Sequence, residues 1–559
     1  MVTVLSVVGT RVTLDCWLGS ICSQMRLHSR RAIDRFMRIT RLEQCILVVL
    51  LLSIMVLVVW SATWSPRVWL PDEVPVAFWA WRLESPSQED VDEAVKQTGT
   101  KVLFLRAGQI DYEKEKLNCI RRAGGRIPGN IDVHLAYNAT RSLLSDFQKL
   151  NDDNLAATVL VAFRQDISRA NDDQAHIVGL QLDFDIPTRL LSKYALVLRG
   201  IRSGLPTEMK LSVTGLPTWM ESPALTHVLS ACDFWVPQCY GVEVPDKLNN
   251  RIPISSPEYV SRYISQARDL GSPFYAGLAA YGYAIHYSRE GLLIGIRGDL
   301  DPTVVAQSNA FEVSDQTPFK IGTKEGSELQ TGEWRRLYKA RRDVILEGTA
   351  VRSGEVILIQ RPTAEGLRAC AAKVRERAGM RLLGICVFRM PATGDSNTLT
   401  LTEITSALKD AEPRFSMDAR AYQLPVCALN RTSVCAVVEL MNSGTAALRS
   451  DEDGMMVLIR LPVGYLESAS ISSSATVQPV SISGDQVVPC SAARANAVKL
   501  TIAWWPPGAR LTARFEIEQP LDKLEIRYAG VLENGSHIEE TEVLPMQRRV
   551  ERYDKDTSQ

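Results

Sequence analysis

Asp183 and Asp185 lie two residues apart at the end of an apolar run, in the stretch HIVGLQLDFDIP at residues 176–187. A carboxylate in or beside an apolar strand is costly unless it is paired, hydrogen-bonded or used in chemistry. Burial and mutual repulsion raise the pKa of such a pair, so that one carboxyl group keeps its proton while the other is ionised. Acid catalysis of glycoside cleavage requires this arrangement. We therefore predict that Asp185 is a general acid and that Asp183 stabilises positive charge.

Side chains alternate between the two faces of a strand, and this alternation separates the polar from the apolar residues of the stretch. One face carries Gly179, Gln181, Asp183 and Asp185, and the other carries Leu180, Leu182 and Phe184. The apolar face is expected to pack against helices. The polar face is then expected to point into a barrel, with Asp185 nearest the mouth.

Polar and aromatic residues also stand at the ends of the other predicted strands. Aromatic faces combined with amide, hydroxyl and guanidinium groups suit a sugar ring, which has apolar faces and polar edges. The alternative is that each aromatic residue packs in the core or at the rim. The predicted carbohydrate-binding residues are Trp79, Trp81, Arg106, Tyr137, Asn138, Gln181, Trp219, Gln238, Tyr240 and Arg389, with Trp235, Tyr281, Tyr283 and Asp395 in similar positions.

Other functional classes find little support in the sequence. The net charge is −1, so nothing indicates a nucleic-acid partner. The cysteine spacings fit no zinc pattern, and a histidine-based metal site would require His134 and His286 to meet. We therefore predict no metal and no cofactor. A different barrel chemistry such as deacetylation stays an alternative, although the sequence indicates no metal site for it.

Eight short apolar runs alternate with helical patterns between residues 74 and 410. A near-continuous apolar strand followed by an amphipathic helix is typical of a parallel sheet covered on both faces, and eight such units predict a (β/α)8 barrel of the TIM type over residues 70–411. A doubly wound open sheet is the competitor, but no Gly-rich phosphate loop follows the first strand. An insertion at residues 286–353 is expected to cover part of the barrel mouth. The runs are residues 74–81, 101–107, 132–138, 177–185, 210–217, 233–241, 273–282 and 382–390.

The segments outside the barrel have their own patterns. Residues 1–44 are basic, and residues 45–64 form an uncharged apolar stretch long enough to span a bilayer as a helix. We predict an uncleaved signal anchor in the bacterial inner membrane, with the arginines in the cytoplasm and the bulk of the chain in the periplasm; a cleaved signal peptide is the alternative. Residues 412–545 alternate in hydrophobicity and predict a seven-stranded β-sandwich, and residues 546–559 form a charged tail.

The run VGLQLDFD resembles the fourth-strand signature of glycoside hydrolase family 18, the chitinase-like barrels, which reads D-G-x-D-x-D-x-E. Gly179 falls on the glycine, Asp183 on the aspartate that orients the acetamido group, and Asp185 on the acid glutamate. Val178 and Gln181 replace the first two aspartates. VPQCYG is similar to the Met-x-Tyr-Asp element of the same family. The resemblance implies a barrel that cleaves an N-acetylated sugar with help from the substrate's acetamido group.

A closer resemblance covers most of the predicted exported region. GLQLDFDIP, LSVTGLPTWM, DFWVPQCYG and FRMPATGD resemble a bacterial family called domain of unknown function 3142. That resemblance implies an exported, barrel-like protein and carries no activity. Two hypotheses follow: a membrane-anchored glycoside hydrolase facing outward onto an envelope or exported polysaccharide, or a non-catalytic barrel that binds glycan or scaffolds the envelope. A structural explanation for Asp183 is a buried ion pair with Arg106 or Arg389.

Overall fold

The computed structural model describes residues 68–548, together with Leu50 and Ser53, apart from residues 242, 244, 251, 299, 317–319, 323–327, 331–332, 425–433, 450–454, 473–474, 485, 503 and 532–536. The predicted basic segment, most of the predicted anchor at residues 45–64 and residues 549–559 of the predicted tail lie outside this description. In the part of the chain that is described, no helix has both the length and the apolar character needed to cross a membrane.

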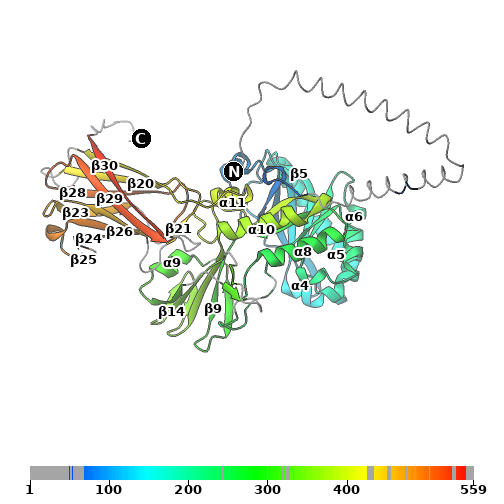
Figure 1. Cartoon of the computed structure of the whole chain (residues 1–559). Coiled ribbons are helices and arrows are strands. Elements are labelled where there is room, and N and C mark those ends of the chain that lie inside the picture. Colours follow the sequence, from blue (N-terminus) through cyan, green and yellow to red (C-terminus); the bar gives the residue numbers. More distant parts are fainter. Residues whose placement is uncertain are drawn as a thin grey trace, which may run out of the picture. The chain divides into compact units, whose positions relative to one another are not determined.

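Eight parallel strands form a closed barrel (Figure 1). The strands follow the order β1-β18-β8-β7-β6-β5-β4-β2, and β1 pairs with β2 to close the ring. Closure rules out the open doubly wound sheet and confirms the predicted barrel. The strands are β1 (Val76–Ala80), β2 (Val102–Glu113), β4 (Asp132–Ala139), β5 (His176–Asp183), β6 (Lys210–Gly215), β7 (Phe234–Pro237), β8 (Phe274–Ala279) and β18 (Leu382–Phe388).

Helices follow most of the strands, and two of the helices begin at a serine that caps the first turn. The Ser87 side chain accepts a hydrogen bond from the backbone of Asp90 at the start of α3, and Ser256 does the same for Tyr259 at the start of α8. The helices are α3 (Gln88–Thr98), α4 (Arg141–Asp146), α5 (Asp152–Asp172), α6 (Leu191–Gly204), α7 (Leu225–Leu229), α8 (Pro257–Asp269), α10 (Ala364–Arg377) and α11 (Leu401–Leu408), with short 3₁₀ turns at Pro71–Glu73, Phe147–Lys149, Thr188–Leu190, Pro217–Trp219, Gly379–Arg381 and Ala492–Arg494.

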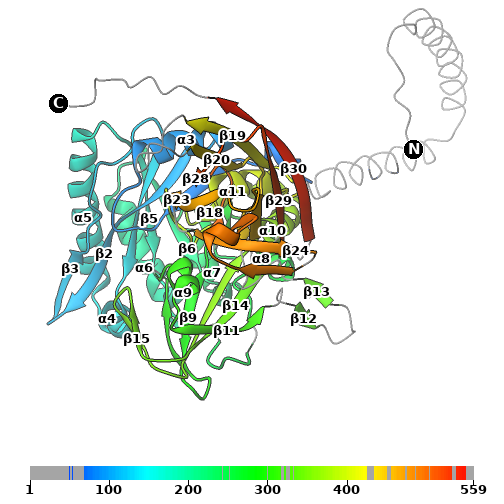
Figure 2. The same ribbon diagram turned by 90° about the vertical axis from the view of Figure 1, so that its left-hand side faces the viewer.

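One barrel unit departs from the strand–helix pattern. After β2 the chain turns back as β3 (Lys116–Ile120), which pairs antiparallel with β2. This hairpin takes the place of a crossover helix and lies beside α5 (Figure 2). It leaves a face of α5 open, so that the apolar side chain of Val161 is 51% exposed.

Two apolar layers hold the barrel together, one outside the strands and one inside. Leu180, Leu182 and Phe184 of β5 and the residue after it are fully or almost fully buried in the outer layer between strands and helices. The inner layer contains Trp79, Phe104 and other residues from four further strands. The predicted alternation along β5 is therefore confirmed. Each large apolar side chain buried in this way contributes about 1.5–3 kcal/mol to folding.

The insertion is an antiparallel sheet of its own and is longer than predicted. Its strands follow the order β10-β9-β17-β14-β11. The predicted limits of residues 286 and 353 are wrong at both ends, because β9 and β17 pair with each other, Ile285 opposite Leu358, and so belong to the same sheet. The elements are β9 (Tyr283–Tyr287), β10 (Leu293–Arg297), α9 (Pro302–Gln307), β11 (Phe311–Gln316), β12 (Lys320–Gly322), β13 (Glu328–Gln330), β14 (Glu333–Ala340), β15 (Val344–Leu346), β16 (Thr349–Val351) and β17 (Val356–Pro362).

A separate β-rich domain follows the barrel. Ten of its described strands, rather than the seven predicted, form one hydrogen-bonded sheet in the order β23-β28-β20-β19-β30-β29-β22-β26-β24-β25, and β21 pairs with β27. The strands are β19 (Met417–Leu424), β20 (Val434–Asn442), β21 (Leu448–Arg449), β22 (Met455–Arg460), β23 (Leu466–Ser472), β24 (Thr476–Ser483), β25 (Gln486–Pro489), β26 (Ala497–Ile502), β27 (Trp504–Trp505), β28 (Arg510–Ile517), β29 (Lys523–Val531) and β30 (His537–Arg548).

Strands from both halves of this sheet share one core, as two packed layers do. Phe515 of β28 and Leu500 of β26, which stand on opposite sides of β30 in the strand order, belong to the same buried cluster. The start of the predicted tail is wrong, because Met546 and the two residues after it belong to β30 and pair with β19.

Candidate active site

Asp183 is the last residue of β5, and its carboxyl group lies inside the barrel. The side chain is 9% exposed. Its Oδ1 accepts a hydrogen bond of 2.5 Å from the Thr214 hydroxyl on β6 and a longer one of 3.5 Å from the Gln238 amide after β7. Loss of hydration and the neighbouring Asp185 carboxylate raise the pKa of Asp183 to about 7, although Thr214 and Arg106 act in the opposite direction. Asp183 therefore gains and loses its proton near neutral pH.

Asp185 lies two residues beyond the buried carboxyl group and is exposed to solvent. Partial loss of hydration raises the pKa of the Asp185 carboxyl group as well. The two carboxyl groups thus differ in their surroundings: Asp183 is buried and hydrogen-bonded, and Asp185 is exposed to solvent. Groups coupled in this way share their protons as a pair.

Several polar atoms inside the barrel have no hydrogen-bond partner. The fully buried Gln181 donates from Nε2 to the Ser212 hydroxyl at 3.3 Å, while its Oε1 accepts nothing. Asn138, which stands opposite Asp183 in the pairing of β4 with β5, has an unpaired Oδ1. The Trp79 Nε1 and the Arg106 Nε are also buried and unpaired. Because most buried polar atoms in proteins are paired, such a group of unpaired atoms on adjoining strands calls for an explanation.

Aromatic rings from four strands or strand ends form a continuous wall. Trp79 stacks on Trp81 with ring centres 5.0 Å apart, and Phe388 contacts Trp79 at 4.9 Å. Tyr240 stacks on Phe388 with ring centres 5.5 Å apart, and Tyr281 meets Phe388 edge-on at 4.8 Å. The structure thus brings together Trp79, Trp81 and Tyr240 as predicted. Phe388, which was not predicted, joins them.

Arg389 does not contact Asp183. Its guanidinium pairs with Asp395 at 3.1 Å, and the exposed Arg82 pairs with the same carboxylate at 2.7 Å. Arg106 forms no ion pair with Asp183 either, among the residues that the structure describes. The hypothesis of a buried ion pair at Asp183 is therefore wrong for both arginines, although Arg106 acts electrostatically on the Asp183 carboxyl.

Two residues predicted to contact carbohydrate lie outside the barrel interior. The Tyr137 hydroxyl donates a hydrogen bond of 2.6 Å to Asp166 on α5, and the ring is completely buried. Trp219 is also completely buried, and its Nε1 donates to the Ile186 carbonyl at 2.8 Å. Both rings belong to the layer between strands and helices. Their positions do not allow contact with a ligand in the barrel, and the prediction is corrected accordingly.

Thr214 and His134 are interior residues that sequence reasoning missed. Thr214 shares the inward face of β6 with Ser212, so strand alternation could have identified it. His134 lies against Gly179, where an added Cβ would stand 2.4 Å from the His134 Nδ1. Burial lowers the pKa of His134 to about 4, so the ring is neutral at physiological pH. The glycine of the sequence signature thus makes room for a histidine.

In the described part of the chain, no group of three or more His, Cys, Asp or Glu side chains is placed to hold a metal ion. His286 lies in the insertion and pairs with Glu355 at 2.8 Å.

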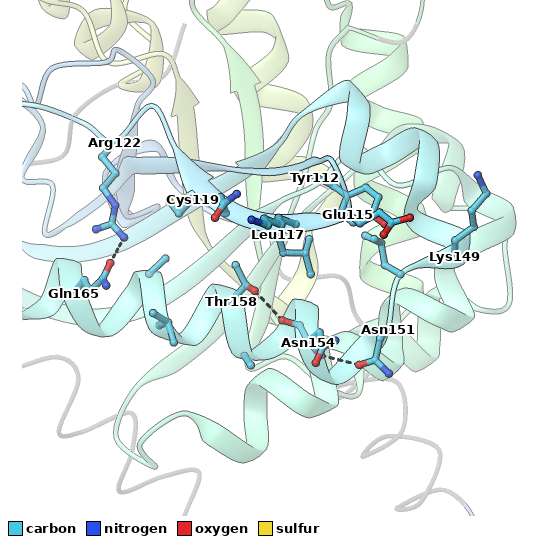
Figure 3. A pocket seen from close by; sticks show the side chains of 16 residues that line it. Tyr112, Glu115, Leu117, Cys119, Arg122, Lys149, Asn151, Asn154, Thr158 and Gln165 are labelled. Atoms are coloured by element: carbon cyan, nitrogen blue, oxygen red, sulfur yellow. Dashed lines mark hydrogen bonds between the residues drawn. The ribbon is translucent and has the colours of Figure 1, made fainter.

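A groove also lies on the outside of the barrel, away from the acid pair (Figure 3). It has a volume of about 890 Å³ and lies between the β2–β3 hairpin and α5. Its lining is mainly polar, and Arg122 is tied to Gln165 across it by a hydrogen bond of 2.5 Å. It has no carboxyl pair and no aromatic wall like those at the barrel mouth.

Comparison with known proteins gives a family match and a set of similar structures. Residues 145–297 match the family model described as Domain of unknown function (DUF3142), which confirms the closer resemblance read from the sequence. This stretch includes β5, β6, β7 and both aspartates. The search of curated proteins gave no match.

The similar solved structures include chitinases at low sequence identity. A chitinase from Chromobacterium violaceum aligns at 13% identity over 60% of this chain and 98% of its own, with a TM-score of 0.39. The spore cortex-lytic enzyme SleL of Bacillus megaterium aligns at 12% identity over 60% and 73% of the two chains, with a TM-score of 0.36. Chitinase ChiW of a Paenibacillus species aligns at 12% identity over 85% of this chain and 43% of its own, with a TM-score of 0.40.

Proposed function

We propose that this protein binds a glycan at the barrel mouth and cleaves it by carboxylate acid catalysis. The observation that carries the proposal is the pair of Asp183 and Asp185: one carboxyl group has a pKa of about 7 in a buried, hydrogen-bonded position, and the other stands open to the mouth two residues further on. Catalytic groups of such barrels lie at the carboxyl ends of the strands, where both residues are found.

The two carboxyl groups have different roles in this proposal. Asp185 reaches the open mouth and protonates the leaving-group oxygen of the glycan. Asp183 is held by Thr214 and stabilises the positive charge that develops on the sugar ring. Repulsion and burial keep one proton on the pair up to about neutral pH, mainly on Asp183. In this proposal Asp183 passes that proton to Asp185 as Asp185 protonates the leaving group, which leaves Asp183 ionised beside the positive charge. Trp79, Trp81 and Tyr240 supply aromatic surface for the sugar ring, and the half-buried Asn138, opposite Asp183 in the strand pairing, is placed to meet its hydroxyl groups.

A non-catalytic glycan-binding or envelope scaffolding role is the second candidate. It is favoured by Gln181, a neutral, completely buried residue that the sequence resemblance aligns with an aspartate. An amide at this position cannot exchange a proton with Asp183. The unpaired polar atoms and the aromatic wall would serve binding without turnover.

We also propose that residues 45–64 anchor the protein in the bacterial inner membrane, with the rest of the chain in the periplasm. The uncharged stretch and the seven arginines before it support this orientation. Protease treatment of intact spheroplasts tests it: digestion of the C-terminal part, with the N-terminal segment protected, is expected. Full protection of the C-terminal part would contradict the orientation.

The catalytic proposal is tested with the full-length protein in detergent. Wild type, Asp185→Asn and Asp183→Asn are incubated with bacterial envelope glycans and with fluorogenic N-acetylhexosamine and hexose oligomers, and products are followed by mass spectrometry. Asp153→Asn, a change at an exposed carboxylate on α5, is the matched control. Cleavage by wild type and the control, lost in both site variants, is expected. Binding without cleavage in all four proteins would replace the catalytic role with the binding role.

A further inference from the structure

Arg106 is a buried arginine at the barrel mouth that has no acidic partner. Its side chain is 8% exposed, and its Nε has no hydrogen-bond partner. The guanidinium carbon lies 4.6 Å from the centre of the Trp81 ring. Other buried arginines of the barrel are paired: Arg389 with Asp395 and Arg375 with Asp410. Among the described residues, Arg106 forms neither an ion pair nor a hydrogen bond through its side chain.

The charges around Arg106 do not neutralise its positive charge. After burial, the strongest influence on its pKa is repulsion from Arg121, which lowers it, and this exceeds the opposing attraction of Asp183. Arg121 is exposed just after β3 and has no ion pair within the described part of the chain. Asp183 already accepts hydrogen bonds from Thr214 and Gln238. The chain itself therefore leaves positive charge unbalanced on this side of the mouth.

A largely buried charge without an acidic partner is destabilising, so its presence indicates a ligand that balances it. The planar guanidinium matches a carboxylate, which it can bind through two parallel hydrogen bonds. Trp81 lies against the same guanidinium and is stacked on Trp79 on its other face, so aromatic surface borders the position of the carboxylate. Arg106 and Asp183 both lie on inward faces of barrel strands, so one sugar chain can reach both.

We propose that the glycan bound at this mouth carries a carboxylate, as a hexuronic acid does, and that Arg106 binds this carboxylate while Trp81 borders the sugar ring. This inference rests on the proposed glycan-binding function and specifies its substrate class. Arg121, the second unbalanced cation, adds long-range attraction for an acidic chain and makes its binding sensitive to salt.

The test compares acidic oligosaccharides with their uncharged methyl esters. Tetramers of galacturonic, glucuronic and mannuronic acid, and the methyl ester of each, are titrated calorimetrically into full-length protein in detergent. The proteins are wild type, Arg106→Gln, Arg106→Lys and the control Arg199→Gln, which changes an exposed arginine on α6. Melting temperatures show whether each variant is folded.

For at least one sugar, we expect wild type and the control to bind the acid about ten-fold or more tightly than the ester, as a charge-assisted bidentate contact implies. Arg106→Gln should lose this preference and bind the ester as wild type does. Arg106→Lys, which keeps the charge and loses the planar fork, should keep part of the preference and serves in place of Arg106→Gln if the neutral variant does not fold.

The possible failures separate the inference from the proposed function. Equal binding of acid and ester by wild type, or a preference that survives in Arg106→Gln, overturns the carboxylate site while leaving a glycan site at the mouth. Binding of neutral glycans alone has the same meaning. Absence of binding to every glycan, acidic or neutral, including the envelope glycans tested above, overturns both.

Discussion

The Thr214 hydroxyl donates a hydrogen bond of 2.5 Å to the Asp183 carboxylate across the paired strands β5 and β6. This contact is the shortest link between the acid pair and the barrel wall that the structure describes. It favours the ionised form of Asp183, whereas burial and Asp185 favour the protonated form. The proton affinity of the pair is therefore set by a balance that single substitutions can shift.

Thr214→Val removes the donor and keeps the shape of the side chain. The ionised form of Asp183 loses a charge-assisted hydrogen bond, so the pKa of Asp183 is expected to rise, by about one unit for a bond of about 1.5 kcal/mol. Carbon-13 NMR titration of the aspartate carboxyl groups measures the change. Thr226→Val, which removes an exposed hydroxyl bonded to the Pro223 carbonyl, is the control. An unchanged or lowered pKa in Thr214→Val would contradict the role given to this bond.

The raised pKa of Asp183 makes folding stability depend on pH. Its folded-state pKa of about 7 lies above the ordinary value of 3.8, so the folded state binds more protons than the unfolded state between these values. As pH rises from about 4 through about 7, the contribution of Asp183 to folding stability is therefore lost. The free energy of unfolding falls by a few kcal/mol at most.

Asp183→Asn removes this dependence while keeping the size of the side chain. Measured by thermal unfolding between pH 5 and pH 8, the variant should gain stability relative to wild type as pH rises. Asp153→Asn, at an exposed site, should follow wild type throughout. A stability difference between Asp183→Asn and wild type that stays constant with pH would show that Asp183 is not the group responsible.

The sequence predicted the barrel because near-continuous apolar strands and amphipathic helices are local patterns, and eight such units are compatible with few architectures. The alternation of side chains along β5 correctly predicted that Gln181 and Asp183 point into the barrel. The same rule excludes Tyr137, since its neighbour Asn138 belongs to the opposite face. The partner of Arg389 could not be predicted, because which carboxylate a guanidinium meets depends on the path of the loop that carries Asp395. Unpaired atoms such as the Arg106 Nε are likewise visible only in three dimensions.

The Asp395 carboxylate holds two arginines of unequal burial, Arg389 inside and Arg82 at the surface. Asp395→Ala leaves the buried guanidinium of Arg389 without its ion-pair partner, so we expect a loss of about 3–5 kcal/mol in the free energy of unfolding. Arg82→Gln breaks only the exposed pair and should cost about 1 kcal/mol or less. Chemical denaturation of the two variants measures both values. Equal losses of unfolding free energy in the two variants would contradict the larger contribution given to the buried pair of Arg389 and Asp395.

Gly179 is expected to tolerate no side chain, although its neighbours on β5 are ordinary strand residues. A Cβ at this position would stand 2.4 Å from the His134 Nδ1 and 2.6 Å from the Lys210 carbonyl oxygen, and the second atom belongs to the backbone of β6 and cannot turn away. Gly179→Ala should therefore cost about 1–3 kcal/mol or more in stability, because a packed interior relieves such overlap only by shifting strands. The shift would move the inward face of β5, so loss of glycan binding should accompany the loss of stability.

Gly298→Ala, where a Cβ meets nothing within 4 Å, is the matched control. Adding His134→Ala to Gly179→Ala should restore only part of the stability, since the Lys210 carbonyl remains in place; complete recovery would show that the histidine ring alone requires the glycine.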